Sequence, residues 1–324
     1  MSEREIRVGE ATAAPGQVAR GRIRVTVGTA ASVEMPVVVI NGSRPGPTVC
    51  VCGGVHGAEY PGIEAAIRLS RSLRPDAVRG AVIIVPIVSV PAFQRRAIYV
   101  NPMDGVNINR VFPGNPSGTI TEVMAAALFG EAVKQSDAFI DLHGGDLVEA
   151  LVPFTIYYQS GNAAVDDASR KMAEAYGIKY IVRSLAMKGG SYQAAAAMGK
   201  PAILTESGGQ GILDDPSVQI HVQGVTNVLR HLGVLEGAPA AVEQPVHLPQ
   251  SAWLASAHGG MFYPTVSIGQ RVEKGQVVGE FRDWFGEPIA TVESPAAGVV
   301  LFLVTSPAIN KGDPILSVGV SDSA

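Results

Sequence analysis

The chain has 324 residues, of which 47% are hydrophobic and 17% are charged. This length accommodates one large α/β domain and a smaller one, and the apolar fraction is enough to bury a core. The 25 Lys and Arg residues and 29 Asp and Glu residues give a formal net charge of −4. Because the sequence also lacks a basic tract, we do not expect a nucleic-acid partner.

The first twenty residues lack the apolar segment of a signal peptide, and no apolar run approaches the roughly 18 residues that cross a bilayer. We therefore expect a cytoplasmic protein with no membrane partner.

Cys50 and Cys52 are two positions apart on a predicted buried strand. Their side chains diverge too much for a comfortable disulfide, so we interpret both as core residues.

Strand and helix patterns alternate from the first residues onward. Arg22–Val27 is typical of an edge strand, and Met35–Gly54 predicts two strands separated by the turn sequence NGSRPG. Pro61 stands in the first turn of a predicted helix, and the apolar run Ala81–Val90 predicts a central strand. The loop GGVHGAEY therefore follows the carboxyl end of a strand, where open α/β sheets place their sites.

The same alternation continues to about residue 232. Thr119 and Glu122 form a predicted capping box ahead of a helix that runs to about Val133, and the buried strand Ala138–Gly145 follows. Further helices are expected at Ala164–Tyr176, Ser191–Met198 and Pro216–Leu232, and further strands at Lys179–Arg183 and Pro201–Glu206. This order of elements predicts an α/β fold.

The composition of the sequence changes at about Leu235, where Pro and Ala become frequent and the regular spacing of apolar residues ends. We predict a catalytic α/β domain over residues 1–244 and a small all-β domain over residues 245–324. The segments VEKGQVVGEF and SPAAGVV resemble the hairpin of biotinyl and lipoyl carrier domains, which implies a barrel-sandwich fold. The turn between them, RDWFGEPIAT, has no lysine to modify, so we favour a domain that shapes the site entrance.

A candidate metal site lies on two strand ends. His56 and Glu59 share one loop, and His143 ends a different buried strand. Two imidazoles and one carboxylate are the ligand set of an open catalytic zinc site, with one Zn²⁺ per subunit. Glycines beside both histidines favour this interpretation over a capping glutamate and two unrelated histidines. The other histidines are interpreted as surface or packing residues: His221, His231, His247 and His258.

Three further polar residues could orient a ligand, act in catalysis or bind the substrate at this site. Asp141 could orient His143, or it could be a buried aspartate satisfied by backbone amides. Glu206 ends a buried strand and is the candidate general base, with a helix cap or a structural acid as the alternative. Arg110, beside Asn109 in VNINRVFPG, could hold a substrate carboxylate in a two-point contact rather than being a surface arginine.

Four motifs in order, GGVHGAEYPG, VNINRVFPG, IDLHGG and ILTESGG, resemble the succinylglutamate desuccinylase and aspartoacylase family of zinc carboxypeptidase-like enzymes. The likeness extends from about residue 45 to the C-terminal end. It implies a mixed-sheet α/β domain of the carboxypeptidase (phosphorylase/hydrolase-like) type followed by a small β domain. It also implies zinc binding by His56, Glu59 and His143, general-base catalysis by Glu206, and substrate binding by Asn109 and Arg110.

The chain departs from the family pattern in one loop. Asn107 stands where family members often have Asp, and residues 100–102 (VNP) stand where they often have an Arg that helps to polarise the scissile carbonyl. Arg95 or Arg96 would have to substitute for it, and we name Arg96 as the candidate.

These observations predict a zinc-dependent deacylase that cleaves a small N-acyl amino acid, such as an N-acetyl-diaminobutyrate-, N-acetylaspartate- or N-succinylglutamate-like compound. The loops around Met187 to Tyr192 and the β tail are expected to line the substrate pocket. A peptide-cleaving metallocarboxypeptidase is disfavoured by the extra β domain. A non-catalytic metal-binding or interaction protein is disfavoured because structural zinc normally has four protein ligands. The family resemblance also implies a homo-oligomer.

Overall fold

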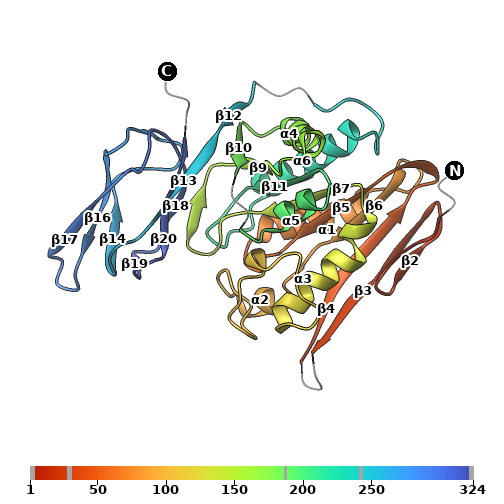
Figure 1. The fold of residues 1–324 in the computed structure, drawn as a ribbon, viewed down its shortest axis with the longest axis horizontal. Coiled ribbons are helices and arrows are strands. Elements are labelled where there is room, and N and C mark those ends of the chain that lie inside the picture. Colours follow the sequence, from red (N-terminus) through yellow and green to blue (C-terminus); the bar gives the residue numbers. More distant parts are fainter. Residues whose placement is uncertain (1–3, 28–30, 186–187, 241–243, 321–324) are drawn as a thin grey trace.

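The computed structural model describes residues 4–27, 31–185, 188–240 and 244–320 (Figure 1). Within these ranges, a nine-stranded sheet has the order β12-β10-β9-β11-β7-β5-β6-β4-β3. Its strands are β3 (Gln17–Val27), β4 (Ala31–Asn41), β5 (Arg44–Gly53), β6 (Arg79–Val85), β7 (Ala138–His143), β9 (Phe154–Tyr158), β10 (Tyr180–Ser184), β11 (Ala202–Glu206) and β12 (Val246–Leu248).

The centre of this sheet is parallel and is bounded by an antiparallel pairing on each side. Strands β11, β7, β5 and β6 run parallel to one another. On one side β4 pairs antiparallel with both β6 and β3, and on the other β9 pairs antiparallel with β11. The expected mixed α/β sheet is therefore confirmed, and β3 is the edge strand that the alternating sequence predicted.

Helices cover both faces of the sheet. One face carries α1 (Tyr60–Ser72), α4 (Ala163–Tyr176) and α6 (Asp215–His231). The other carries α3 (Ile120–Glu131), α5 (Ser191–Ala197) and the hairpin of β1 (Ile6–Val8) and β2 (Ala11–Ala13). In Figure 1, α4 and α6 lie above the central strands and α3 and α5 below them. None of the helices in the described ranges is both long and apolar enough to cross a membrane.

Central strands are apolar on both sides because both sides are covered. In β5, Cys50 and Cys52 pack into the core under α3, whereas Val49 and Val51 pack into the core under α1. Both cysteines are buried and free of a disulfide, which confirms their interpretation as core residues.

One predicted boundary is wrong. Strand β6 ends at Val85 rather than at Val90, and the helix α2 (Val90–Arg95) begins at the residue where the strand was expected to end. Pro86 has no N–H for the sheet ladder, and Pro91 stands in the first turn of α2, where proline is favourable. The correction matters because α2 packs on the loop of His56. A Cβ atom on Gly57 would lie only 2.1 Å from the backbone N of Phe93.

The remaining predicted helices and strands are present, with boundaries that shift by a few residues at most. The capping box ahead of α3 is also confirmed. Thr119 Oγ1 accepts a hydrogen bond from the Glu122 N–H, and the Glu122 carboxylate accepts one from the Thr119 N–H. The strands β1, β2 and β8 (Glu149–Leu151) were not predicted, because three residues are too few to show a period. The five-residue strand β9 of the large sheet was also missed.

The C-terminal part is all β, as expected. Its strands are β13 (Gln250–Ala255), β14 (Gly260–Pro264), β15 (Arg271–Val272), β16 (Val277–Arg282), β17 (Pro288–Glu293), β18 (Gly298–Val304), β19 (Ala308–Ile309) and β20 (Pro314–Val320). They form two antiparallel sheets, ordered β13-β20-β18-β15 and β17-β16-β14-β19, which enclose Phe262, Phe281 and Leu316. Figure 1 places these sheets beside the β10 and β12 end of the large sheet.

Two short strands cross between the large sheet and the C-terminal sheets. β12 follows the predicted boundary at residue 245 but pairs in parallel with β10 of the large sheet. β8 precedes that boundary but pairs antiparallel with β18. This exchange ties the C-terminal strands to the α/β part, and the division into domains at residue 245 stays a prediction.

Candidate metal centre

Two neighbouring parallel strands position the three candidate ligands. His56 follows β5, Glu59 immediately precedes α1, and His143 is the last residue of β7. Strands β5 and β7 pair in parallel with Gly53 opposite Leu142, so their carboxyl ends lie at the same edge of the sheet. One ligand atom from each of the three residues lies within 4.8 Å of the others.

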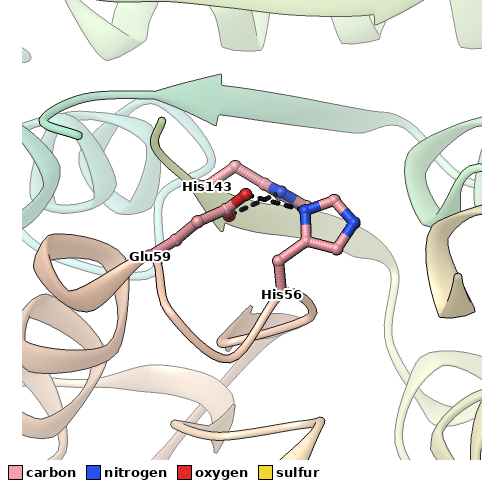
Figure 2. Close-up of side chains that lie close together, drawn as sticks. All are labelled: His56, Glu59 and His143. Carbon is pink, nitrogen blue, oxygen red and sulfur yellow. Dashed lines mark hydrogen bonds and ion pairs between the residues drawn. The ribbon is translucent and has the colours of Figure 1, made fainter. Parts of the chain in front are cut away.

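The carboxylate of Glu59 contacts both imidazole rings (Figure 2). His56 Nδ1 is 2.7 Å from Glu59 Oε1, and His143 Nδ1 is 2.9 Å from Glu59 Oε2. The donor atoms therefore converge on one point. Two imidazole nitrogens and one carboxylate, with further coordination positions left open toward a cavity, fit a catalytic zinc ion.

The charges of these groups favour a cation at their centre. Burial alone lowers the pKa of both histidines, but the Glu59 carboxylate at His56, and Asp141 together with Glu59 at His143, outweigh it and raise both pKa values. Burial would raise the pKa of Glu59, yet His143 and His56 outweigh that effect and lower it. Protons on the imidazoles thus balance the carboxylate, and a divalent cation would replace them.

Asp141 contacts the ring nitrogen of His143 that does not contact Glu59. His143 Nε2 donates to Asp141 Oδ2 at 2.9 Å, and Asp141 is completely buried. Its carboxylate also accepts hydrogen bonds from Ser191 Oγ and, at 3.2 Å, from Cys52 Sγ. With the proton on Nε2, Nδ1 is left to bind a metal. Of the two interpretations open for Asp141, these contacts favour the orienting role.

A second buried network fixes the backbone at the same strand end. The His143 carbonyl accepts a hydrogen bond from His221 Nε2 at 2.9 Å, and the other ring nitrogen of His221 lies 2.8 Å from Tyr176 Oη. Burial lowers the pKa of His221 to about 4, so the ring is neutral at pH 7. The interpretation of His221 as a packing residue is confirmed, and the other three are exposed: His231, His247 and His258.

A cavity of about 610 Å³ opens on the three candidate ligands. The α/β part contributes most of its wall, and the C-terminal sheets contribute Trp253 and Phe302. Of the loop expected to line the pocket, Lys188, Gly190 and Tyr192 do so. Met187 lies outside the described residues.

Glu206 reaches this cavity from the next strand. It is the last residue of β11, which pairs in parallel with β7 so that Glu206 lies opposite His143. Within the described part of the chain, its Oε2 atom is closed off from solvent and has no hydrogen-bond partner. Burial, with the negative charges of Glu59 and Glu149, raises the pKa of Glu206 well above its usual range despite the opposing effect of His143.

The NINR segment lines another part of the wall. Asn107 Oδ1 is 3.2 Å from His56 Nε2, so it occupies the orienting position toward this ligand. Asn109 and Arg110 follow on a single 3₁₀ turn, and both line the cavity. Asn109 Oδ1 accepts a hydrogen bond from the Ser191 N–H, and Arg110 donates to the Asn109 carbonyl at 2.8 Å.

Arg96 is not brought to this site. It ends α2 with a left-handed backbone (φ 52°), its side chain is exposed, and neither it nor Arg95 lines the cavity. The turn that begins at Pro86 forms a helix on the outside of the His56 loop and leaves Arg96 at the far end of that helix.

Among the polar residues of the cavity wall that sequence reasoning missed, three are charged or phenolic. They are Tyr99, Glu149 and Arg183. Glu149 lies on a strand of three residues, and Tyr99 has a left-handed backbone (φ 58°) in an irregular loop. Neither position has a periodic pattern that could have singled it out.

Comparison with known proteins identifies the family of this chain. The model of the succinylglutamate desuccinylase/aspartoacylase catalytic domain matches residues 45–232. N-alpha-acetyl-L-2,4-diaminobutyric acid deacetylase of Halomonas elongata is 34% identical over 294 residues, which are 88% of this chain and 85% of that protein. The chain belongs to the succinylglutamate desuccinylase/aspartoacylase family.

Solved structures of this family share the whole fold. A succinylglutamate desuccinylase/aspartoacylase from Rhodobacter sphaeroides has a TM-score of 0.84 at 29% identity, covering 95% of this chain and 96% of that one. The product-bound ectoine utilization protein EutE (DoeB) from Ruegeria pomeroyi has a TM-score of 0.85 at 30% identity, covering 94% and 95%. Membership in the succinylglutamate desuccinylase/aspartoacylase family places the chain among hydrolases of non-peptide amide bonds.

We predict that Asp141→Asn lowers the affinity for zinc about 10- to 100-fold, because the amide orients His143 less strongly than the carboxylate does. Competition with a chelator of known affinity measures this. Asp167→Asn, the same change at the surface of α4, is the matched control and keeps the wild-type affinity. Equal affinities for Asp141→Asn and the wild type would contradict the orienting role.

Zinc affinity should rise with pH. Because the pKa values of His56 and His143 are raised, these rings hold their protons to a higher pH than a free imidazole does, and each proton must leave when the metal binds. The apparent affinity therefore increases as the pH rises toward the raised pKa values and levels off above them. Titration calorimetry between pH 6 and pH 9, in buffers of different ionisation enthalpy, measures both the affinity and the released protons. A pH-independent affinity without proton release would disprove the charge balance described above.

Proposed function

We propose that the chain is a zinc-dependent deacylase that hydrolyses the amide bond of a small N-acylated amino acid. The observation that carries the proposal is the juxtaposition of Glu206 and the ligand cluster. The unpartnered Oε2 of Glu206 lies at the end of β11, directly beside the strand that supplies His143, and both residues line one cavity.

His56, Glu59 and His143 would hold the zinc ion. When bound, zinc polarises the scissile carbonyl and lowers the pKa of the attacking water. Glu206 accepts a proton from that water and returns it to the leaving nitrogen. Its burial keeps its pKa high in the metal-free protein, and the positive charge of the metal lowers that pKa again toward the range of a working base.

Arg110 would bind the substrate carboxylate. It lines the cavity, and the 3₁₀ turn that carries it is held by the Asn107 and Asn109 side chains. Asn101, in the segment where family members often have an arginine, is buried and bonded to Met103 N and Met124 Sδ. Polarisation of the carbonyl is therefore assigned to zinc.

The relative from Halomonas elongata is named for an N-acetylated diamino acid, which supports an N-acetyl-diaminobutyrate-like substrate over the N-acetylaspartate- and N-succinylglutamate-like ones. Trp253 and Phe302 of the C-terminal sheets wall off the cavity, which argues against the open groove that a peptide substrate needs. A non-catalytic metal site does not require a buried carboxylate without a hydrogen-bond partner, so Glu206 argues against that alternative.

The cytoplasmic location and the homo-oligomer stay predictions.

We expect Glu206→Gln to retain zinc but to lower kcat about 100- to 10,000-fold, because the amide cannot accept the proton. Metal analysis and hydrolysis of N-alpha-acetyl-L-2,4-diaminobutyrate give the two readouts. Glu273→Gln, at an exposed position of the C-terminal part, is the matched control. Near-native turnover by Glu206→Gln would remove Glu206 as the base.

Removal of the Arg110 guanidinium should weaken the binding of substrates that carry a free α-carboxylate. Arg110→Ala is expected to lower kcat/KM about 10- to 100-fold for such a substrate, and much less for its carboxamide analogue, which has no charge to lose. Arg271→Ala, at an exposed position far along the chain, controls for loss of a positive charge. Equal losses on both substrates would show that Arg110 does not bind the carboxylate.

A further inference from the structure

A second buried carboxylate, that of Glu149, lies in the same cavity and has no task in the hydrolysis described above. Its side chain lines the cavity wall, and only 8% of the residue is exposed. Glu149 Oε1 accepts a hydrogen bond from Tyr99 Oη at 2.6 Å, and Oε2 accepts one from the Asp146 N–H at 2.7 Å. A carboxylate offers about four acceptor positions, so these two bonds leave room for a further donor.

The backbone fixes Glu149 relative to the reacting groups. The turn from Asp146 to Glu149 follows the strand that ends at His143, and the Gln210 N–H, four residues after Glu206, bonds to the Glu149 carbonyl at 3.0 Å. Two glycines permit this close packing. A Cβ atom would lie 2.6 Å from the Glu149 carbonyl oxygen if placed on Gly145, and 2.4 Å from it if placed on Gly209.

The C-terminal sheet holds the other side of this residue. Glu149 begins β8, which pairs with β18 so that Glu149 lies opposite Val304. The Thr305 N–H also donates to the Val148 carbonyl at 2.8 Å. Glu149 is thus held from both parts of the molecule, and its position in the cavity is rigid.

Nothing in the described part of the chain balances the charge of Glu149. No Lys, Arg or His side chain of these residues lies within ion-pair distance of its carboxylate. Its charge also acts on Glu206, and the charged neighbours that act most strongly on Glu149 itself are the acids Glu59 and Asp146. Burial, reinforced by those acids and opposed by its two hydrogen bonds, raises its pKa to about 7. A buried charge without a counter-ion is costly, and a cationic group in the cavity would remove that cost.

We propose that Glu149 binds a free ammonium group of the substrate, so that the enzyme selects N-acylated diamino acids over N-acylated dicarboxylic amino acids. The inference rests on the proposed function, since it places the amide at the zinc site and the α-carboxylate at Arg110. A second substrate carboxylate would instead meet the charge of Glu149. Among the residues that the structure describes, two cations besides Arg110 line the cavity, Arg183 and Lys188, and neither pairs with Glu149; Arg183 bonds through Nε to the Pro249 carbonyl.

The substitution Glu149→Gln removes the negative charge and keeps the size and shape of the side chain. The amide oxygen can accept from the Asp146 N–H, and the amide nitrogen can donate to Tyr99 Oη, so both existing contacts are kept while the negative charge is lost. Glu149→Met, of similar length, serves as a second neutral variant if the Gln variant does not fold. Glu273→Gln, exposed and outside the cavity wall, is the matched control for the loss of one negative charge.

The experiment compares three substrates with the zinc-loaded full-length enzyme. N-alpha-acetyl-L-2,4-diaminobutyrate carries the ammonium group, N-acetyl-L-norvaline is its neutral isostere, and N-acetyl-L-glutamate carries a second carboxylate. For the wild type and Glu273→Gln, we expect kcat/KM to be about 10- to 100-fold higher for the diamino compound than for the isostere, and lowest for the glutamate. For Glu149→Gln, we expect the ratio of kcat/KM for the diamino compound to kcat/KM for the isostere to fall to about onefold. Hydrolysis of the norvaline compound persists.

The experiment gives different results if the deacylase proposal fails and if the ammonium-site proposal fails. If the zinc-loaded wild type hydrolyses none of the three compounds, the proposed deacylase function fails. If it hydrolyses them but favours norvaline or glutamate, the ammonium site is overturned while the deacylase remains. If the wild type favours the diamino compound and the folded neutral variants keep that preference, Glu149 is not the group that binds the ammonium.

Discussion

The parallel pairing of β5, β7 and β11 is the constraint on which the rest of the structure depends. It sets Gly53 opposite Leu142 and Glu206 opposite His143, so that the ends of three strands meet at one edge of the sheet. Residues that are distant in sequence thereby become neighbours, and none of them needs a long side chain to reach the cavity. The strands are apolar on both faces and covered by helices, which leaves their carboxyl ends as the place where polar groups can converge.

This convergence concentrates negative charge in a buried space. Glu59 and Asp141 are balanced by the two imidazoles they contact, but Glu149 and the Oε2 atom of Glu206 are not paired with any cation among the described residues. Such groups destabilise a fold unless a ligand compensates them. A metal ion at the imidazole cluster and a positively charged substrate group near Glu149 would supply that compensation. The same buried carboxylates therefore carry an electrostatic cost and select the cations that can bind beside them.

The C-terminal sheets take part in this arrangement rather than merely adjoining it. They provide Trp253 and Phe302 to the cavity wall, and through β18 they hold the short strand on which Glu149 lies. In return, β12 extends the large sheet beside β10. Of the two segments that resemble a carrier domain, SPAAGVV leads into β18, whose sheet lines the cavity, so this strand has a structural role that needs no lysine.

The sequence by itself determined the α/β alternation, the all-β tail and the ligand motifs, because periodicity, capping residues and short-range spacing are local properties. It also brought His56 and Glu59 together, since they share one loop. Only the tertiary structure decided that Arg96 lies outside the cavity and that Glu149 lies inside it. Each depends on contacts between segments far apart in the chain: α2 packs against Gly57, and β8 pairs with a strand about 150 residues later. No local pattern encodes such pairings, because their stability comes from the packed molecule as a whole.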